Sequence, residues 1–247
     1  MKIRYMQEDG AAIVYDGDCP LQIEGRMFDP SYWEARAALV GQASGRGTTW
    51  FVQQGGEQWA LRHYRRGGWI AKFVTDRYLW LGLARTRAWR EWHLTARLHA
   101  LGLPVPVPVA ARVIRKGLSY RADLITRRIA DVEPLSQRLQ DAPVSGDDWR
   151  RLGELLRRLH DTGLDHADLN AHNVLQGSDR QFWLIDFDRA RLRTAGRWRE
   201  RNLRRLLRSL RKLRRQSPRF CWTEADWAAL QAGYEEGGST RTGRSLS

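Results

Sequence analysis

The stretch GLDHADLNAHNVLQ, residues 163–176, crowds polar side chains into a few positions just before a short apolar run. They are His166, Asp168, Asn170, His172 and Asn173. Asp and Asn often hold turns through their own side chains, so a purely structural role is one interpretation of Asp168 and Asn173. The two histidines lack the spacing of a tetrahedral metal site, and we predict that His166 packs the loop and supports it.

A second acid, Asp186, favours a chemical role for this stretch. The turn GSDRQ leads into the apolar run FWLI, and Asp186 follows that run. We predict a loop, then a hairpin, with Asp186 where the second and buried strand ends. Asp168, Asn173 and Asp186 are then expected to converge. Two carboxylates and a carboxamide suit phosphoryl transfer, in which one acid accepts the proton of a hydroxyl and the other oxygens hold a hard cation.

Strand signals dominate the first half of the chain. Apolar runs on either side of Gly55-Gly56 and of Lys116-Gly117 predict two antiparallel hairpins. Between them, apolar residues at helical spacing predict a helix over residues 86–101. A further helix-like stretch covers residues 32–40.

Helix signals dominate the second half. Leucines at helical spacing predict a helix after Asp147 or Asp148, either of which serves as its cap, and Gly163 ends it. The whole pattern predicts an α+β, two-lobed fold with an antiparallel-sheet N-terminal lobe and a mainly helical C-terminal lobe. We place the lobes at residues 1–125 and 126–238 and a disordered tail at 239–247.

The net charge of +14 resides almost entirely in one segment of the chain. Between Arg189 and Arg219, fourteen Lys and Arg residues accompany a single acid, Glu200. Leucines from Leu203 to Leu213 recur at helical spacing, which predicts a helix with one packed and one basic face. A solvated charged face is the ordinary interpretation, but the excess of cations favours docking to an acidic glycolipid or membrane.

Composition excludes several classes of protein. With 247 residues, of which 42% are hydrophobic, the chain is expected to be globular rather than disordered. No apolar run reaches the length of a membrane span. Cys19 and Cys221 show no metal or redox spacing, and no leader pattern opens the chain. We therefore expect a cytoplasmic protein with reduced thiols.

The order His-x-Asp-(four residues)-Asn, followed by Asp-Phe, resembles the catalytic and metal-binding loops of the protein-kinase-like superfamily. A Gly-rich loop, a strand ending in basic residues and a helix with Glu91 precede it in the expected order. The segments GRGTTWFV, LRHYRRGG, YRADLITRRI, GLDHADLNAHNVL and WLIDFDRARLR resemble the Kdo kinase family of lipopolysaccharide core assembly. Kdo is 3-deoxy-D-manno-octulosonic acid. The resemblance covers most of residues 45–193.

This resemblance implies an ATP-dependent sugar kinase that phosphorylates the 4-hydroxyl of Kdo on Kdo-lipid A. It also implies a peripheral enzyme at the cytoplasmic face of the bacterial inner membrane. By position in the motif, Asp168 matches the catalytic base, while Asn173 and Asp186 match the ligands of Mg²⁺.

The resemblance also implies phosphate-binding residues in the first lobe. Gly45 and Gly47 match the Gly-rich loop, and Glu91 matches the helix carboxylate that partners a cation. Arg62 occupies the place of the usual lysine, with Lys72 as the alternative. An alternative interpretation of Glu91 is an exposed ion pair on the surface of its helix. An alternative interpretation of the two glycines is an ordinary hairpin turn.

Departures from the motif narrow the substrate class. Asp188 replaces the glycine of Asp-Phe-Gly, and no Ala-Pro-Glu segment follows, so a peptide substrate is not favoured. The rivals are another kinase of the superfamily, acting on a different sugar, small molecule or protein, and a non-catalytic, anion-binding module. Aminoglycoside phosphotransferases have similar loops but acidic clefts, unlike this basic chain. We expect no nucleic-acid partner, and the sequence indicates no protein partner.

Overall fold

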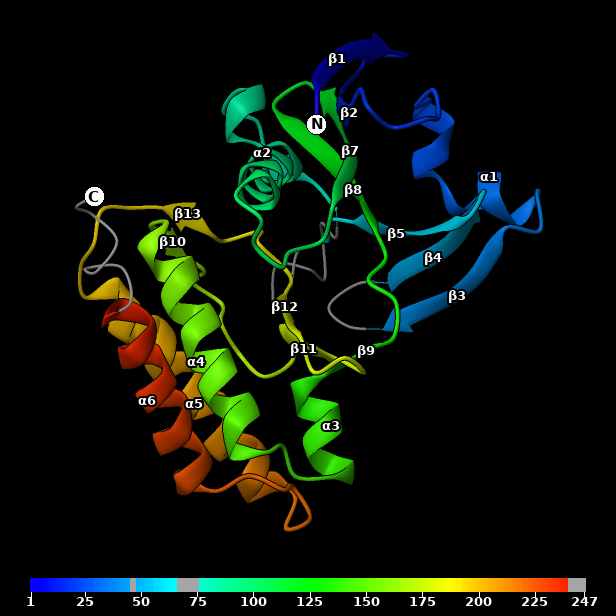
Figure 1. Cartoon of the computed structure of the whole chain (residues 1–247). Coiled ribbons are helices and arrows are strands. Elements are labelled where there is room, and N and C mark those ends of the chain that lie inside the picture. The colour runs from blue at the N-terminus through cyan, green and yellow to red at the C-terminus, as the bar shows by residue number, and fades with distance from the viewer. Residues whose placement is uncertain (45–47, 66–75, 240–247) are drawn as a thin grey trace, which may run out of the picture. The chain divides into compact units, whose positions relative to one another are not determined.

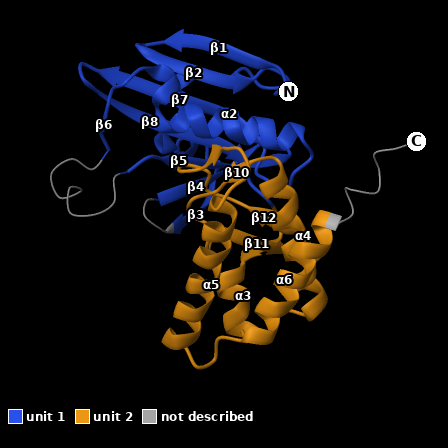
Figure 2. Ribbon diagram, turned by 90° about the vertical axis from the view of Figure 1, so that its left-hand side faces the viewer, with its two compact units in different colours: residues 1–129 blue, residues 130–247 orange. Residues whose placement is uncertain are grey.

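The computed structural model describes residues 1–44, 48–65 and 76–239. The chain divides into two units, residues 1–129 and residues 130–247 (Figures 1 and 2). Unit 1 is built on an antiparallel sheet and unit 2 is mainly helical, which confirms the predicted α+β class. Within the described ranges, no helix is long and apolar enough to cross a membrane. Gly45, Gly47, Lys72 and residues 240–247 of the expected tail lie outside these ranges.

Unit 1 forms its sheet from segments far apart in the sequence. The strands are β1 (Ile3–Glu8), β2 (Ala11–Asp16), β3 (Leu39–Ser44), β4 (Thr48–Gln54), β5 (Glu57–His63), β6 (Tyr78–Leu79), β7 (Pro108–Lys116) and β8 (Ser119–Arg127). The helices are η1 (Gly25–Phe28), α1 (Pro30–Glu34), η3 (Leu83–Arg85) and α2 (Arg87–Ala100). The described strands follow the order β1-β2-β7-β8-β5-β4-β3, and β6 pairs with β8. Both predicted hairpins, β4–β5 and β7–β8, are present.

Both faces of this sheet are covered, and each has its own core. Side chains alternate between the faces of a strand, so neighbouring residues of β2 enter different cores. Ile13 packs in a cluster with Trp33 of α1, and Val14 packs in a second cluster with Trp92 of α2. Because Trp92 is completely buried, α2 is anchored to the sheet, and the neighbouring Glu91 is turned inward with it.

The segment before β4 differs from the sequence prediction. The helix predicted over residues 32–40 is wrong, because α1 ends at Glu34 and β3 begins at Leu39. Ala37 adopts a left-handed φ of 52°, and the amide of Gln53 donates to the carbonyl of Ala38 at 2.7 Å. Pairing with β4 has therefore overridden the local helical pattern.

Unit 2 consists of helices around short strands. The strands are β9 (Val132–Pro134), β10 (Leu164–Asp165), β11 (Val174–Gly177), β12 (Phe182–Leu184) and β13 (Arg191–Leu192). The helices are α3 (Leu135–Asp141), α4 (Gly146–Asp161), α5 (Trp198–Gln216) and α6 (Glu224–Ser239). The predicted basic helix is confirmed as α5: Leu206 and Leu210 are buried while most of its arginines are exposed.

The cap of α4 lies earlier than the sequence suggested. Ser145, and neither Asp147 nor Asp148, is the cap: its Oγ accepts the amide of Asp148 at 3.2 Å and donates to the Asp148 carboxylate at 2.9 Å. The pair differs from a capping box, because the Asp148 carboxylate accepts from the hydroxyl of the cap residue and not from its backbone amide. The predicted stop is confirmed, since α4 ends at Asp161 and Gly163 adopts a φ of 86°.

Two glycines allow α4 and α6 to pack backbone against backbone (Figure 1). A Cβ added at Gly153 would lie 2.0 Å from the carbonyl oxygen of Leu230, and one at Gly233 would lie 2.1 Å from that of Arg150. No side chain fits at either distance. The close packing fixes α4, whose C-terminal end leads through Gly163 and β10 into the polar loop that begins at residue 166.

Candidate active site

The polar loop, residues 166–173, connects β10 to β11. Ala167, inside it, and Asp186, after β12, have left-handed backbones with φ of 57° and 65°. Residues with a Cβ rarely adopt this conformation, and surrounding contacts must hold them in it. Such constrained residues concentrate at functional sites, and these two flank or include the predicted catalytic and metal-binding acids.

One backbone carbonyl orients both loop asparagines. The carbonyl oxygen of Asp168 accepts Nδ2 of Asn170 at 2.8 Å and Nδ2 of Asn173 at 3.0 Å. The amide of His172 in turn donates to Oδ1 of Asn170 at 2.9 Å. Since only the NH₂ end of an amide donates, the bond to Asp168 leaves Oδ1 of Asn173 as the end that accepts or coordinates.

Backbone pairing brings Asp186 to the same place. The amide of Ile185 donates to the carbonyl of Asn173 at 3.1 Å, and Val174 pairs with Leu184 across the β11–β12 ladder. Asp186 is the next residue of the chain. The predicted convergence therefore has a structural basis within unit 2, while the catalytic and metal-binding roles remain predictions.

The buried His166 side chain contacts the residues on either side of Asp186. Its ring is buried, Nε2 lies 3.1 Å from the carbonyl oxygen of Ile185, and the ring centroid is 5.1 Å from that of Phe187. Burial lowers the pKa of His166, which favours the neutral ring. A carbonyl only accepts, so the proton resides on Nε2. These contacts match the loop-packing role predicted for His166.

Sequence reasoning missed two residues of α5 that hold the loop. Asn202, 3% exposed, accepts the amide of His166 at 2.9 Å and donates to Asp165 Oδ1 at 2.8 Å. One side chain thus joins α5 to the start of the loop. Oγ of Ser209 accepts the amide of Ala171 at 3.2 Å. The sequence did contain a signal for both residues, because each is a small polar residue on the packed side of an amphipathic helix.

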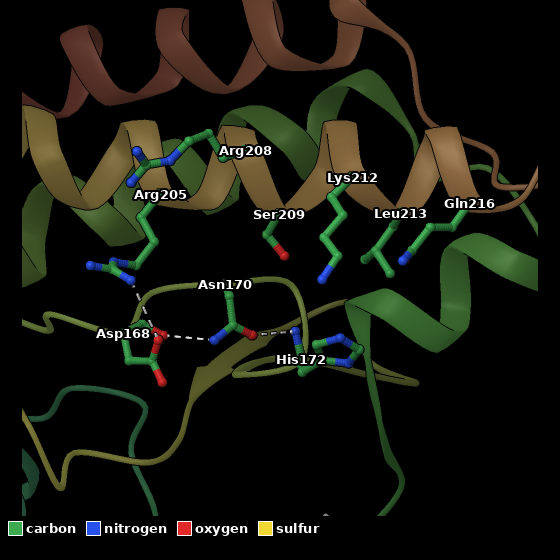
Figure 3. Close-up of a pocket in the computed structure, with 9 residues that line it drawn as sticks. All are labelled: Asp168, Asn170, His172, Arg205, Arg208, Ser209, Lys212, Leu213 and Gln216. Carbon is green, nitrogen blue, oxygen red and sulfur yellow. Dashed lines mark hydrogen bonds and ion pairs between the residues drawn. The ribbon is translucent and has the colours of Figure 1, made fainter. Parts of the chain in front are cut away.

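A cavity of about 370 Å³ lies between the loop and α5 (Figure 3). Its lining residues are Asp168, Asn170, His172, Arg205, Arg208, Ser209, Lys212, Leu213 and Gln216. Three of them are cations on one side of α5, opposite a single acid. Asp168 Oδ1 lies 3.8 Å from Nη1 of Arg205, and the Asp168 side chain is 18% exposed. The predicted catalytic base therefore lines a basic cavity built entirely from unit 2.

Unit 1 contains the predicted pair of Arg62 and Glu91. Arg62 of β5 forms an ion pair with Glu91 of α2, and the hydroxyl of Tyr64 donates to the same carboxylate. Glu91 is only 4% exposed and Arg62 is 27% exposed. The alternative interpretation, an exposed ion pair along one helix, is therefore wrong for Glu91, because its carboxylate is buried and pairs with Arg62 on a strand. Phosphate binding by Arg62 remains a prediction.

The donor set is compatible with a magnesium ion. Among the described residues, no group of three or more His, Cys, Asp and Glu side chains is arranged to hold a metal. Mg²⁺ does not require such a group, since it usually takes one or two protein carboxylates and keeps waters and substrate phosphates as its other ligands. The carboxylate of Asp186 and Oδ1 of Asn173 fit that requirement.

Comparisons with known proteins identify the family of the chain. The model of the lipopolysaccharide kinase (Kdo/WaaP) family matches residues 30–234, a range that includes every predicted site residue. The chain is similar to a 3-deoxy-D-manno-octulosonic acid kinase from Xanthomonas axonopodis pv. citri (strain 306), with 46% identity over 225 residues that cover 91% of this chain and 89% of the relative.

Proteins of the same name from two other bacteria are also similar. The one from Vibrio vulnificus (strain CMCP6) is 41% identical over 233 residues, which cover 94% of this chain and 98% of the relative. The one from Haemophilus influenzae (strain 86-028NP) is 39% identical over 241 residues, which cover 93% and 98%. The similarity therefore extends over nearly the full length of both partners in each comparison.

Proposed function

The chain belongs to the lipopolysaccharide kinase (Kdo/WaaP) family, and from this premise we propose that it uses ATP to phosphorylate the 4-hydroxyl of Kdo on Kdo-lipid A. Membership makes it a kinase, and the similar proteins named 3-deoxy-D-manno-octulosonic acid kinase supply the sugar. The structural observation that carries the proposal is the hydrogen-bonded link between Asp168, Asn173 and the residue preceding Asp186.

Asp168 is the proposed catalytic base. It orients the acceptor hydroxyl and accepts its proton, while the hydroxyl oxygen forms a bond to the γ-phosphorus. The bond from that phosphorus to the oxygen shared with the β-phosphate breaks, which leaves ADP and the phosphorylated sugar. The position of Asp168 in the wall of a cavity supports this role, because the cavity provides space for an acceptor beside the carboxylate.

Asn173 and Asp186 are the proposed ligands of magnesium. When bound with ATP, Mg²⁺ would neutralise charge on the phosphate oxygens. Asn173 contributes through Oδ1, because its Nδ2 is engaged by the carbonyl of Asp168. His166 and the left-handed backbone at Asp186 keep the second ligand in position.

In unit 1, Arg62 is the proposed contact to ATP phosphates, with Glu91 as the carboxylate that positions it. A guanidinium always carries its charge and presents two donors to two phosphate oxygens, which suits it to the place of the usual lysine. Its partial exposure leaves part of the side chain accessible while Glu91 holds the other part. Gly45 and Gly47 remain proposed phosphate-loop residues, and Lys72 remains the alternative cation.

We also propose peripheral binding to the anionic inner face of the bacterial inner membrane. The exposed cations of α5 support it, since each Lys or Arg near such a surface contributes about 1 kcal/mol. The expected result is co-sedimentation with anionic liposomes that weakens as salt is raised. Binding that ignores both salt and lipid charge contradicts this part of the proposal.

Incubation with γ-labelled ATP, Mg²⁺ and Kdo-lipid A tests the catalytic proposal. We expect label in the glycolipid, none in lipid A that lacks Kdo, and none in casein or RNA run in parallel. NMR of the product, correlating phosphorus with the sugar protons, should place the phosphate at position 4. Label in the protein control, or an unlabelled glycolipid under all conditions, would contradict the assignment of the acceptor.

A further inference from the structure

The basic wall of the cavity contains cations that the protein itself does not neutralise. Arg208 and Lys212 lie one helical turn apart on α5, and Lys212 points across the cavity toward Asn170 and His172 (Figure 3). Neither cation forms a hydrogen bond or an ion pair with any residue that the structure describes.

Other arginines of the same helix have acidic partners. Arg199 contacts Asp161 at 3.0 Å, and Arg204 contacts Glu200 at 2.8 Å. Arg211 forms two hydrogen bonds to Glu224, at 2.8 Å and 3.0 Å. The unpaired cations are therefore not a general property of α5. Two of them, Arg208 and Lys212, lie where the helix borders the same cavity as Asp168.

We propose that Arg208 and Lys212 form a subsite that binds the carboxylate of a sugar-acid acceptor, while Arg205 positions Asp168. This inference rests on the proposed function, whose acceptor is an octulosonic acid and so carries a carboxylate. A guanidinium binds a carboxylate through two parallel hydrogen bonds, and an ammonium adds a point charge. Specificity for an acidic sugar over a neutral one follows from these two side chains.

The dimensions of the wall suit this assignment. At 1.5 Å of rise per residue, Arg205 and Lys212 are separated by about 10 Å along α5. A single sugar can therefore present a hydroxyl to Asp168 at one end while its carboxylate lies near Lys212. The Arg208 side chain extends along α5 toward Arg205, so it must turn toward Lys212 for both cations to contact that carboxylate (Figure 3). The cavity, at about 370 Å³, is within the range of about 300–1,000 Å³ found for small-molecule sites.

Equilibrium binding without ATP tests the subsite independently of catalysis. The full-length protein is titrated with free Kdo and with Kdo methyl ester, in which the carboxylate charge is removed. The variants are Arg208→Gln, Lys212→Gln and the double variant. The matched control is Arg204→Gln, which removes one charge from the same helix but does not border the cavity.

We expect Kdo to bind the double variant at least tenfold more weakly than the wild type, and the control within twofold of it. The methyl ester should bind the wild type about as weakly as Kdo binds the double variant, and the substitutions should not weaken it further. Equal binding of Kdo and its ester to the wild type would overturn the proposal. So would an equal loss for both ligands in the double variant.

A competition experiment distinguishes a subsite for the sugar carboxylate from a subsite for phosphate. Lipid A also carries phosphate groups, so inorganic phosphate is titrated against bound Kdo. Displacement of Kdo only at phosphate concentrations well above that of Kdo supports a carboxylate subsite. Displacement at concentrations below that of Kdo would assign the cations to phosphate and overturn the proposal.

A kinetic experiment distinguishes failure of the subsite from failure of the proposed function. With Kdo-lipid A, the double variant should show a KM for the acceptor at least tenfold higher, with an unchanged KM for ATP and an unchanged melting temperature. An unchanged acceptor KM would overturn the subsite. If the wild type phosphorylates no Kdo glycolipid, the proposed function fails, whereas the titrations still decide whether the cavity binds a sugar carboxylate.

Discussion

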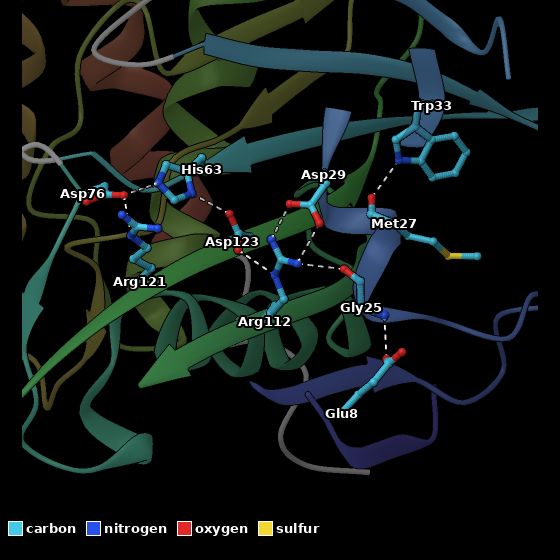
Figure 4. A network of polar contacts seen from close by, with 10 residues as sticks. All are labelled: Glu8, Gly25, Met27, Asp29, Trp33, His63, Asp76, Arg112, Arg121 and Asp123. Carbon is cyan, nitrogen blue, oxygen red and sulfur yellow. Dashed lines mark hydrogen bonds and ion pairs between the residues drawn. The ribbon is translucent and has the colours of Figure 1, made fainter. Parts of the chain in front are cut away.

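Arginines in the two units have opposite surroundings. Arg112 of unit 1 is 9% exposed and donates to Asp123, to Asp29 and to the carbonyl of Gly25 at distances of 2.8–3.1 Å (Figure 4). Arg208 of unit 2 borders a cavity and pairs with no described residue. An enclosed cation needs several acceptors to offset its lost hydration, whereas an unpaired cation at a cavity remains available to a ligand. The partners of a cation therefore indicate its role better than its residue type.

The network around Arg112 shows what such a structural cation does. Asp123 also accepts Nδ1 of His63 at 2.6 Å, and Asp29 lies 83 positions before Arg112 in the sequence. The guanidinium thus joins β7 and β8 to the segment that leads into α1 (Figure 4). Arg62 is an intermediate case, because it pairs with buried Glu91 yet remains partly exposed.

The largest expected effect is on catalysis, at the acid that shares the cavity with the unpaired cations. Asp168→Asn keeps the shape of the side chain but removes the group that accepts the proton. Turnover should fall by about 10²–10⁴-fold, the usual contribution of a general base. Steady-state kinetics measures it, with the dissociation constant for ATP and the melting temperature expected to stay unchanged. A turnover within threefold of the wild type would exclude Asp168 as the base.

The second effect is on stability, in unit 1. Arg112→Met leaves the carboxylates of Asp123 and Asp29 without their shared cation, and breaking a buried ion pair costs about 3–5 kcal/mol of unfolding free energy. Urea denaturation measures the loss. Substitution of Arg208 by Met is the matched control and should have little effect. A loss below about 1 kcal/mol in Arg112→Met would contradict the contrast between the two cations.

The third effect depends on pH and concerns His160, at the end of α4. Burial, followed by the nearby Arg199 of α5, lowers the pKa of His160 to about 4. The unfolded chain, near 6.5, binds the proton more readily. The stabilisation by the neutral ring is therefore complete above about pH 6.5 and is lost as the pH falls toward 4. Between about pH 7 and pH 4.5 the loss should be about 2–3 kcal/mol.

Urea denaturation of the wild type and of His160→Gln, at about pH 7 and about pH 4.5, measures this loss of unfolding free energy. The glutamine can still interact with the hydroxyl of Tyr234, which lies 2.8 Å from Nδ1 of His160. Burial also lowers the pKa of His166, but its contribution to the pH dependence is the same in both proteins and cancels in their difference. An identical pH dependence in both would show that His160 does not carry the effect.

Much of the fold was predictable because local signals coincided with it. The hairpins at Gly55-Gly56 and Lys116-Gly117 and the stop at Gly163 are determined by residues close together in the sequence. The β1–β2 hairpin was missed although Asp9-Gly10, with φ of 49° and 76°, is a strong hairpin signal. The helix predicted over residues 32–40 failed because pairing with β4 is a long-range interaction that local spacing does not encode.

The candidate site was predictable to a similar extent. Asp168 and Asn173 lie five positions apart, and their hydrogen-bonded loop follows from that spacing. Asn202 was not identified, because its contact with His166 spans 36 positions and depends on where α5 packs. The pairing of some cations of α5 and not of others depends on the positions of Glu224 and Asp161, which no pattern within the helix reveals.

The fourth effect concerns the intermediate case in unit 1. Glu91→Gln removes the charge that holds Arg62 but keeps an acceptor of similar shape. The KM for ATP should rise about tenfold, which corresponds to about 1.4 kcal/mol, with a smaller change in turnover. Initial-rate kinetics at varied ATP measures it, and Glu57→Gln, on the same strand as Arg62, is the control. If KM for ATP is unchanged while stability falls, Arg62 and Glu91 belong with Arg112 as structural residues.

The smallest effect is the one that distinguishes the two kinds of arginine most sharply. Arg208 lies four positions before Lys212, and a like-charge pair at this spacing destabilises a helix by about 0.2–0.5 kcal/mol, whereas the neighbouring Arg204 and Arg211 are paired with acids. Arg208→Gln should therefore leave the unfolding free energy unchanged or raise it by up to about 0.5 kcal/mol, and the gain should shrink as salt screens the charges. Urea denaturation at low and high salt measures this. Such a gain would show that the fold does not need Arg208, as expected of a cation that serves a ligand. A loss of more than about 1 kcal/mol in Arg208→Gln would show instead that this arginine, like Arg112, stabilises the structure around it.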